Sequence, residues 1–93
     1  MVIGYLELDL HFPHARSLKD KRRALRSIKD RLRSQFNVSV AELDFQDTWQ
    51  RAKVGVAAIG GQPALVEQVL ARIRDDVLCH LNGEVLSAEI RYY

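Results

Sequence analysis

The chain has 93 residues, of which 47% are hydrophobic and 28% are charged, as expected for one small globular domain over 1–93. No apolar run approaches the roughly 18–20 residues of a membrane span. The single cysteine, Cys79, excludes an internal disulfide and a cysteine-based metal cluster. The N-terminus enters a patterned strand without a signal-peptide core, so we expect a cytoplasmic protein with no membrane partner.

The net charge of +2 conceals an uneven distribution. Residues 19–33 hold eight of the fourteen basic side chains and two of the twelve acids, so this window carries +6. The other six bases and ten acids leave the rest of the chain at −4. This uneven charge distribution predicts that an anionic partner would bind at residues 19–33.

A strand and a helix are predicted first. Residues 2–12 alternate apolar and polar side chains, and a period of two predicts a half-buried strand that Pro13 ends. Ser17 can cap a helix over about 18–36, in which apolar residues recur at helical spacing.

The rest of the chain predicts a hairpin, a helix and a last strand. Residues 38–46 and 50–59 read as two strands joined by a turn. A helix begins near Pro63 and ends before Asn82, and residues 84–92 alternate again. The order β-α-β-β-α-β predicts an α+β, ferredoxin-like fold, with both helices on one face of a four-stranded antiparallel sheet.

Three segments also carry a family resemblance. FPHARSLKDKRR at 12–23, FNVSVAE at 36–42 and QDTWQRA at 46–52 resemble the YlxP-like family of small bacterial proteins of unknown function. The resemblance implies a ferredoxin-like fold. Members of that family tend to be encoded beside translation and ribosome-maturation factors, which implies work near RNA or ribosomes.

The first candidate site is a basic stripe on the first helix. At 100° per residue one helix face carries Lys19, Arg22, Arg26, Lys29 and Arg33. Such a row can follow a phosphate backbone and release its counterions. The alternatives are an acidic protein partner, or a solvated face with the i, i+3 pairs Asp20–Arg23 and Asp30–Arg33.

Two further clusters are candidates. Arg16, Ser17 and Lys21 lie at the junction of the first strand and helix, where free backbone N–H groups could hold a phosphate. The alternative for Lys21 is that it snorkels along the sheet edge. The second cluster is in the hairpin and consists of Trp49, Gln50 and Arg51. It could stack on a base or anchor a protein interface, or Trp49 could cover the end of the core.

No catalytic constellation is visible. His11, His14 and His80 lack supporting ligands at metal-binding spacing, and no glycine-rich phosphate loop or nucleophile motif occurs. We therefore expect no enzyme, no metal and no cofactor.

The leading hypothesis is an RNA- or ribosome-associated binding protein acting through the basic first helix. The alternative is a homodimeric interaction module that uses the open sheet face around Ile3 and Tyr5. A remote alternative is a phosphate-ester or acyl-phosphate hydrolase, because acylphosphatases share the fold, although their arginine-bearing glycine-rich signature is absent.

Overall fold

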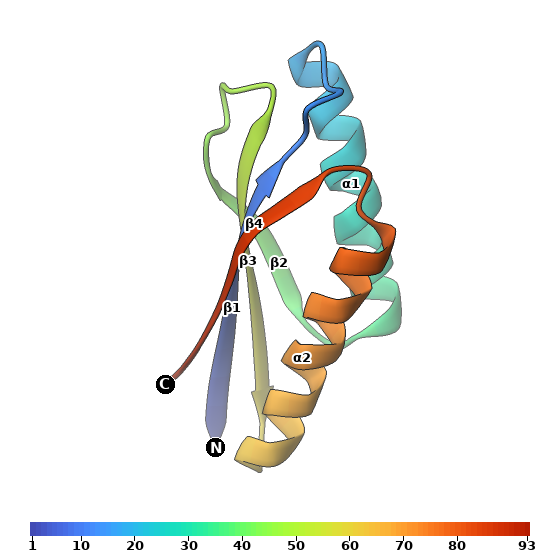
Figure 1. Ribbon diagram of the computed structural model, residues 1–93. Helices are drawn as coiled ribbons and strands as arrows, with labels where there is room; N and C mark the ends of the chain where they lie inside the picture. The colour runs from blue at the N-terminus through green and yellow to red at the C-terminus, as the bar shows by residue number, and fades with distance from the viewer.

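The computed structural model describes residues 1–93 and contains six elements in the predicted order (Figure 1). They are β1 (Val2–His11), α1 (Leu18–Gln35), β2 (Ser39–Asp44), β3 (Arg51–Gly60), α2 (Pro63–His80) and β4 (Glu84–Tyr92). The predicted bounds differ from these by at most two residues, chiefly at the hairpin, where residues 45–50 form the loop.

The four strands form one antiparallel sheet in the order β2-β3-β1-β4. β1 pairs with β3 along its whole length and with β4 through a register shift between Asp9 and Leu10. Both helices lie on the same side of the sheet (Figure 1), which confirms the ferredoxin-like fold. The molecule is elongated, with extents of 42 × 21 × 17 Å.

The core lies between the sheet and the helices and contains sixteen buried apolar residues. The predicted alternation of β1 is confirmed, because Leu6, Leu8 and Leu10 are fully buried. The two helices contribute unequally. From α2 the buried apolar residues are Val66, Leu70, Ile73 and Val77, whereas α1 contributes Leu25 and Leu32. The helix α1 therefore leaves most of its surface outside the core.

The helix α2 lies very close to β1 at Gly4. A Cβ atom at this position would lie 2.5 Å from Val66 Cγ1 and 2.7 Å from Leu70 Cδ1. Both neighbours are buried core side chains with little room to move. Glycine at position 4 thus sets how closely α2 packs on the sheet.

The predicted cap of α1 is present. Ser17 Oγ accepts a hydrogen bond from the Asp20 N–H at 3.1 Å, and the Asp20 carboxylate accepts one from the Arg16 N–H at 3.0 Å. These bonds satisfy backbone donors at the start of the helix, which have no partner within it.

Lys21 is completely buried, and the expectation that it snorkels along the sheet edge is wrong. Its ammonium donates hydrogen bonds to the carbonyls of Phe45 at 2.6 Å, Arg51 at 3.2 Å and Gln46 at 3.5 Å. It also lies 3.2 Å from Glu42 Oε2, outside hydrogen-bond geometry. The hairpin lies against the first turns of α1, and carbonyls in and beside its loop replace the water that the ammonium would otherwise seek.

Other bonds join the same end of the molecule. The Gln50 side chain donates to the carbonyls of Pro13 at 3.3 Å and Ala15 at 3.4 Å, while the Gln50 carbonyl accepts from the Phe12 N–H at 2.8 Å. The loop between β1 and α1 is thereby tied to the hairpin loop. The segments 12–23 and 46–52, noted above in the sequence, meet here.

We expect Gly4→Ala to lower the free energy of unfolding by about 1–3 kcal/mol, because the added methyl group overpacks the contact with α2. Urea unfolding measures the change. Gly61→Ala is the matched control, since no atom lies within 4 Å of a Cβ there. Equal stability of the two variants would contradict the close approach.

We expect Lys21→Met to lower the free energy of unfolding by about 3–5 kcal/mol, because it leaves the Glu42 carboxylate and three carbonyls without their cation. Lys19→Met, two residues away and exposed, should change stability by no more than about 0.5 kcal/mol. Thermal and urea denaturation of both variants check this, and a loss of under about 1 kcal/mol in Lys21→Met would show that the buried ammonium is dispensable.

Candidate functional site

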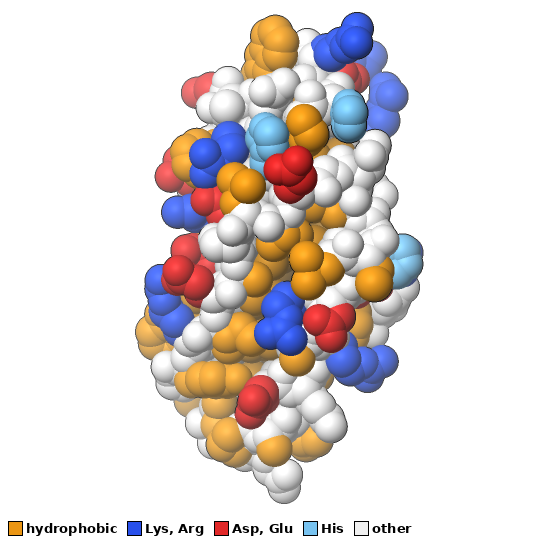
Figure 2. All heavy atoms as spheres, in the orientation of Figure 1, with side chains coloured by type: hydrophobic (Ala, Val, Ile, Leu, Met, Phe, Trp, Pro, Cys, Tyr) orange, Lys and Arg blue, Asp and Glu red, His pale blue; other side chains and the backbone are white.

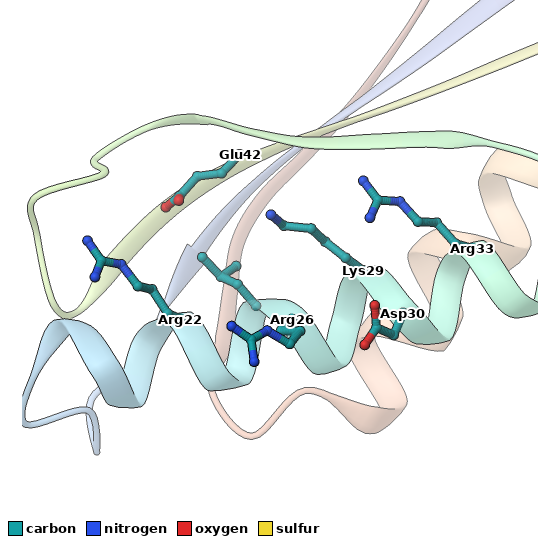
Figure 3. A pocket seen from close by; sticks show the side chains of 7 residues that line it. Arg22, Arg26, Lys29, Asp30, Arg33 and Glu42 are labelled. Carbon is teal, nitrogen blue, oxygen red and sulfur yellow. The ribbon is translucent and has the colours of Figure 1, made fainter.

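The basic stripe of α1 borders a groove between this helix and β2. The groove has a volume of about 400 Å³. Figure 3 shows Lys29 and Arg33 reaching from the helix toward β2, and Glu42 reaching back from the strand. The lining residues are Arg22, Leu25, Arg26, Lys29, Asp30, Arg33 and Glu42.

Arg33 holds one end of this groove in place. One of its guanidinium nitrogens donates to the Val40 carbonyl at 2.7 Å. Val40 belongs to β2, the outermost strand on this side of the sheet, so the bond satisfies a carbonyl at the free edge. Arg33 thus connects the basic stripe to the sheet.

A second depression continues along the first half of α1. Its volume is about 430 Å³, and no acidic side chain lines it. Its four lining residues are Lys19, Arg22, Arg23 and Arg26. Because Arg22 and Arg26 line both hollows, the two form one continuous positively charged surface along the helix.

None of the cations that line the two hollows has an acidic partner. The i, i+3 pairs Asp20–Arg23 and Asp30–Arg33 are not formed, and Asp20 accepts a hydrogen bond from the backbone of Arg16 instead. No carboxylate oxygen lies within 4.0 Å of any of the six cations that line the two hollows. Arg33 donates to the Val40 carbonyl, and the other five have no hydrogen-bond partner in the protein, namely Lys19, Arg22, Arg23, Arg26 and Lys29. Their charge is therefore available to a partner or to solvent.

Arg31 differs from the stripe. Its guanidinium makes hydrogen bonds of 2.9 and 3.1 Å to both carboxylate oxygens of Asp76 and so joins α1 to α2. The Asp76 carboxylate raises the pKa of Arg31 above its ordinary value by stabilising the charged form. This arginine serves helix packing.

The structure does not bring Arg16, Ser17 and Lys21 together as one anion pocket. The Ser17 hydroxyl caps α1, and the Arg16 side chain is exposed. The Lys21 ammonium lies among the carbonyls of the hairpin. The Lys21 ammonium is therefore not available to bind an anion at the start of α1.

The hairpin cluster is also divided. Trp49 is 52% exposed in the loop, so it does not cover the end of the core. Arg51 is held by two 2.8 Å bonds to the Asp9 carboxylate and lies over the Phe45 ring at 4.6 Å. Because Gln50 ties the two loops together, Trp49 is the one member of this cluster whose side chain is free to meet a partner.

On the open face of the sheet, charged and polar side chains pair with one another. Tyr5 donates its hydroxyl to Glu7 at 2.9 Å, and burial together with this carboxylate raises the pKa of Tyr5 to about 12. Arg91 donates to Glu89 at 2.8 Å. The structure contains no group of three His, Cys, Asp or Glu side chains placed to bind a metal ion. Neither helix is long and apolar enough to cross a membrane.

The sequence did not reveal the strand side of the groove. Glu42 and the Val40 carbonyl face α1 only because the chain turns back after the helix. The half-buried position of Glu42 in β2 carries no pattern of its own, and a backbone carbonyl has no side-chain signature.

Comparisons with known structures agree on the fold. A de novo designed protein, Ferredog-Diesel, matches with a TM-score of 0.53 and 12% identity, covering 96% of this chain and 83% of that one. The apo form of LarC2, the C-terminal domain of a cyclometallase involved in the synthesis of the NPN cofactor of lactate racemase, matches with a TM-score of 0.51 and 8% identity. That match covers 100% of this chain and 55% of the other. At such identities the likeness concerns the fold alone.

Comparison with known sequences gives the family. The chain is 40% identical over 72 residues to the uncharacterized protein YlxP of Bacillus subtilis (strain 168), covering 77% of this chain and 78% of that protein. The model of a family described as a protein of unknown function, DUF503, matches residues 3–90. The chain therefore belongs to the DUF503 family, which confirms the resemblance to YlxP-like proteins.

Proposed function

We propose that this chain is a non-enzymatic, cytoplasmic RNA- or ribosome-associated protein that contacts RNA phosphates through the basic stripe of α1. The observation that carries the proposal is the set of five cations along two adjoining hollows that have neither an acidic partner nor a hydrogen bond within the protein. The rest of the chain is net acidic, so this surface is where a polyanion would be attracted.

The spacing of the cations suits an extended anion. Arg22, Arg26 and Lys29 lie about one helical turn apart, and the stripe from Arg22 to Arg33 spans roughly 16 Å at about 1.5 Å per residue. A single small anion would use one or two of these groups. A nucleic acid backbone presents many phosphates and can engage the row together.

The arginine content of this surface also favours phosphate binding. Three of the five unpaired cations are arginines, whose planar guanidinium groups can form two parallel hydrogen bonds to a phosphate. Phosphate contacts position a nucleic acid without reading its bases, so we expect weak sequence preference.

The open face of the sheet is less suited to RNA. Many RNA-binding domains of this topology stack bases on aromatic side chains of the sheet. β3 contains no aromatic residue, and Arg51, at its start, is occupied by Asp9. The basic surface of α1 is therefore better suited to contact RNA than the open face of the sheet.

The double variant Arg22→Gln/Arg26→Gln should bind RNA about tenfold or more weakly at low salt, because two phosphate contacts are lost. The slope of log affinity against log salt should fall by about 1.4–1.8, since each neutralised phosphate contributes about 0.7–0.9. Fluorescence anisotropy with a short single-stranded RNA and a short RNA duplex, over a salt series, measures both quantities.

Arg72→Gln/Arg74→Gln on α2 is the matched control. It removes the same two charges from a helix, from positions outside both hollows. Glutamine and arginine have similar helix propensity, so both variants should stay folded. Equal salt slopes in the two double variants, or wild-type binding that is unchanged between low and moderate salt, would contradict the proposal.

A cosedimentation experiment tests the ribosome directly. Wild-type protein mixed with bacterial ribosomes at low salt should pellet with them, and Arg22→Gln/Arg26→Gln should pellet less than Arg72→Gln/Arg74→Gln because the α1 surface is weakened. The outcome that would refute RNA contact is capture of a protein from lysate that persists after nuclease treatment but is lost with Arg22→Gln/Arg26→Gln. That outcome would identify an acidic protein as the partner instead.

A further inference from the structure

We infer that β4 is a self-association edge, which pairs antiparallel with β4 of a second copy about a twofold axis at Ile90. The pairing would join two four-stranded sheets into one continuous sheet. This interface differs from the open sheet face expected from the sequence, because it uses the edge of the sheet and its backbone groups.

β4 is the less protected edge of the sheet. It is outermost in the strand order, nine residues long and free of proline. Only Val85 and Ile90 are even half-buried, and Tyr92 is 47% exposed. β2, the opposite edge, has six residues and receives Arg33 on its free side. Natural proteins commonly block long exposed edges with prolines, charges or bulges. β4 has a register shift near Leu86, but its stretch from Ser87 to Tyr92 pairs regularly with β1, contains no proline and carries one acid and one base.

Figure 2 views the molecule from the side on which β4 lies nearest the viewer. Hydrophobic side chains reach the surface along the middle of this side, with charged groups scattered among them. The exposed apolar residues of the structure include Leu86, Tyr92 and Tyr93, which come from β4 and the residue after it.

Hydrogen bonding to β1 determines which backbone groups remain free. The Tyr93 N–H donates to the Ile3 carbonyl at 2.8 Å, and the Ile3 N–H donates to the Tyr93 carbonyl at 3.1 Å. In an antiparallel ladder such pairs alternate, so Arg91 and Glu89 also direct their backbone groups to β1. The N–H and C=O groups of Ala88, Ile90 and Tyr92 therefore face the free edge.

These free groups define a self-complementary register. With the axis at Ile90, each Ile90 faces its symmetry mate, and Ala88 faces Tyr92 of the second copy. All of these positions direct their hydrogen-bonding groups outward, as a paired ladder requires. On the helix side of the sheet, the two Ile90 side chains would meet, and each Tyr92 ring would cover an exposed Ala88.

Charge selects the same register. Glu89 would face Arg91 of the second copy in a non-hydrogen-bonded pair, in which side chains approach most closely. Symmetry makes two such ion pairs. Within one chain Arg91 already donates to Glu89 at 2.8 Å, with both side chains more than half exposed. An axis at Ala88 would place Glu89 opposite Ser87, so both ion pairs would be lost.

Charge reversal tests this register. Glu89→Arg alone places arginine opposite Arg91, and Arg91→Glu alone places two glutamates together. Each variant should dimerise about tenfold or more weakly than wild type, measured by sedimentation over a concentration series. An equimolar mixture of the two variants should restore dimers, because every cross-strand pair then has opposite charges.

Two further variants locate the interface. Ala88→Pro removes an N–H that faces the free edge and none that bonds β1, so it should block association and leave the fold intact by circular dichroism. Ile59→Lys places a charge on the open face of the sheet and should leave association unchanged. Wild-type protein that stays monomeric at ~1 mM, or dimers lost in Ile59→Lys but kept in Ala88→Pro, would overturn the inference.

Discussion

The buried ammonium of Lys21 is the contact on which the arrangement of this molecule depends. It has no exposed surface and lies among three carbonyls and the Glu42 carboxylate. A charge removed from water loses several kcal/mol of hydration unless polar groups replace it. The hairpin loop supplies those groups, so the first turns of α1 and residues 45–50 must take up their positions together.

The same contact determines how the basic stripe is presented. Residues on a helix are separated by 100°, so fixing Lys21 toward the hairpin also fixes the rotation of α1 about its axis. Arg22, Arg26 and Lys29 then lie along the groove between α1 and β2. Because α1 buries only Leu25, Leu32 and Lys21, this rotation depends on polar contacts at both ends, with Arg33 bonded to β2 at the other. The charged surface is consequently held by backbone carbonyls of the hairpin and of an edge strand.

Local patterns in the sequence predicted the elements and the stripe, because both depend on periodicity. The complete burial of Lys21 was not among these predictions. Its partners could not be predicted, since they are backbone carbonyls 24, 25 and 30 residues further along the chain. Every residue has a carbonyl, and only the fold decides which remain unpaired. The hydrogen bonds of Gln50 could not be predicted for the same reason, because their acceptors are backbone carbonyls. Arg51 was predicted to contact a partner, whereas its guanidinium is hydrogen-bonded to Asp9.

The strand order places the two proposed surfaces on opposite sides of the molecule. The groove along α1 adjoins β2, and the pairing edge is β4, three strand spacings or roughly 14 Å away within one sheet. Pairing through β4 would leave both basic stripes uncovered, with the outer strands of the two copies about 34 Å apart at about 4.8 Å per strand. A dimer of this kind would offer two separate phosphate-binding surfaces to one RNA. The second contact would then be intramolecular, so modest affinity at each stripe could produce much tighter binding wherever the RNA spans both.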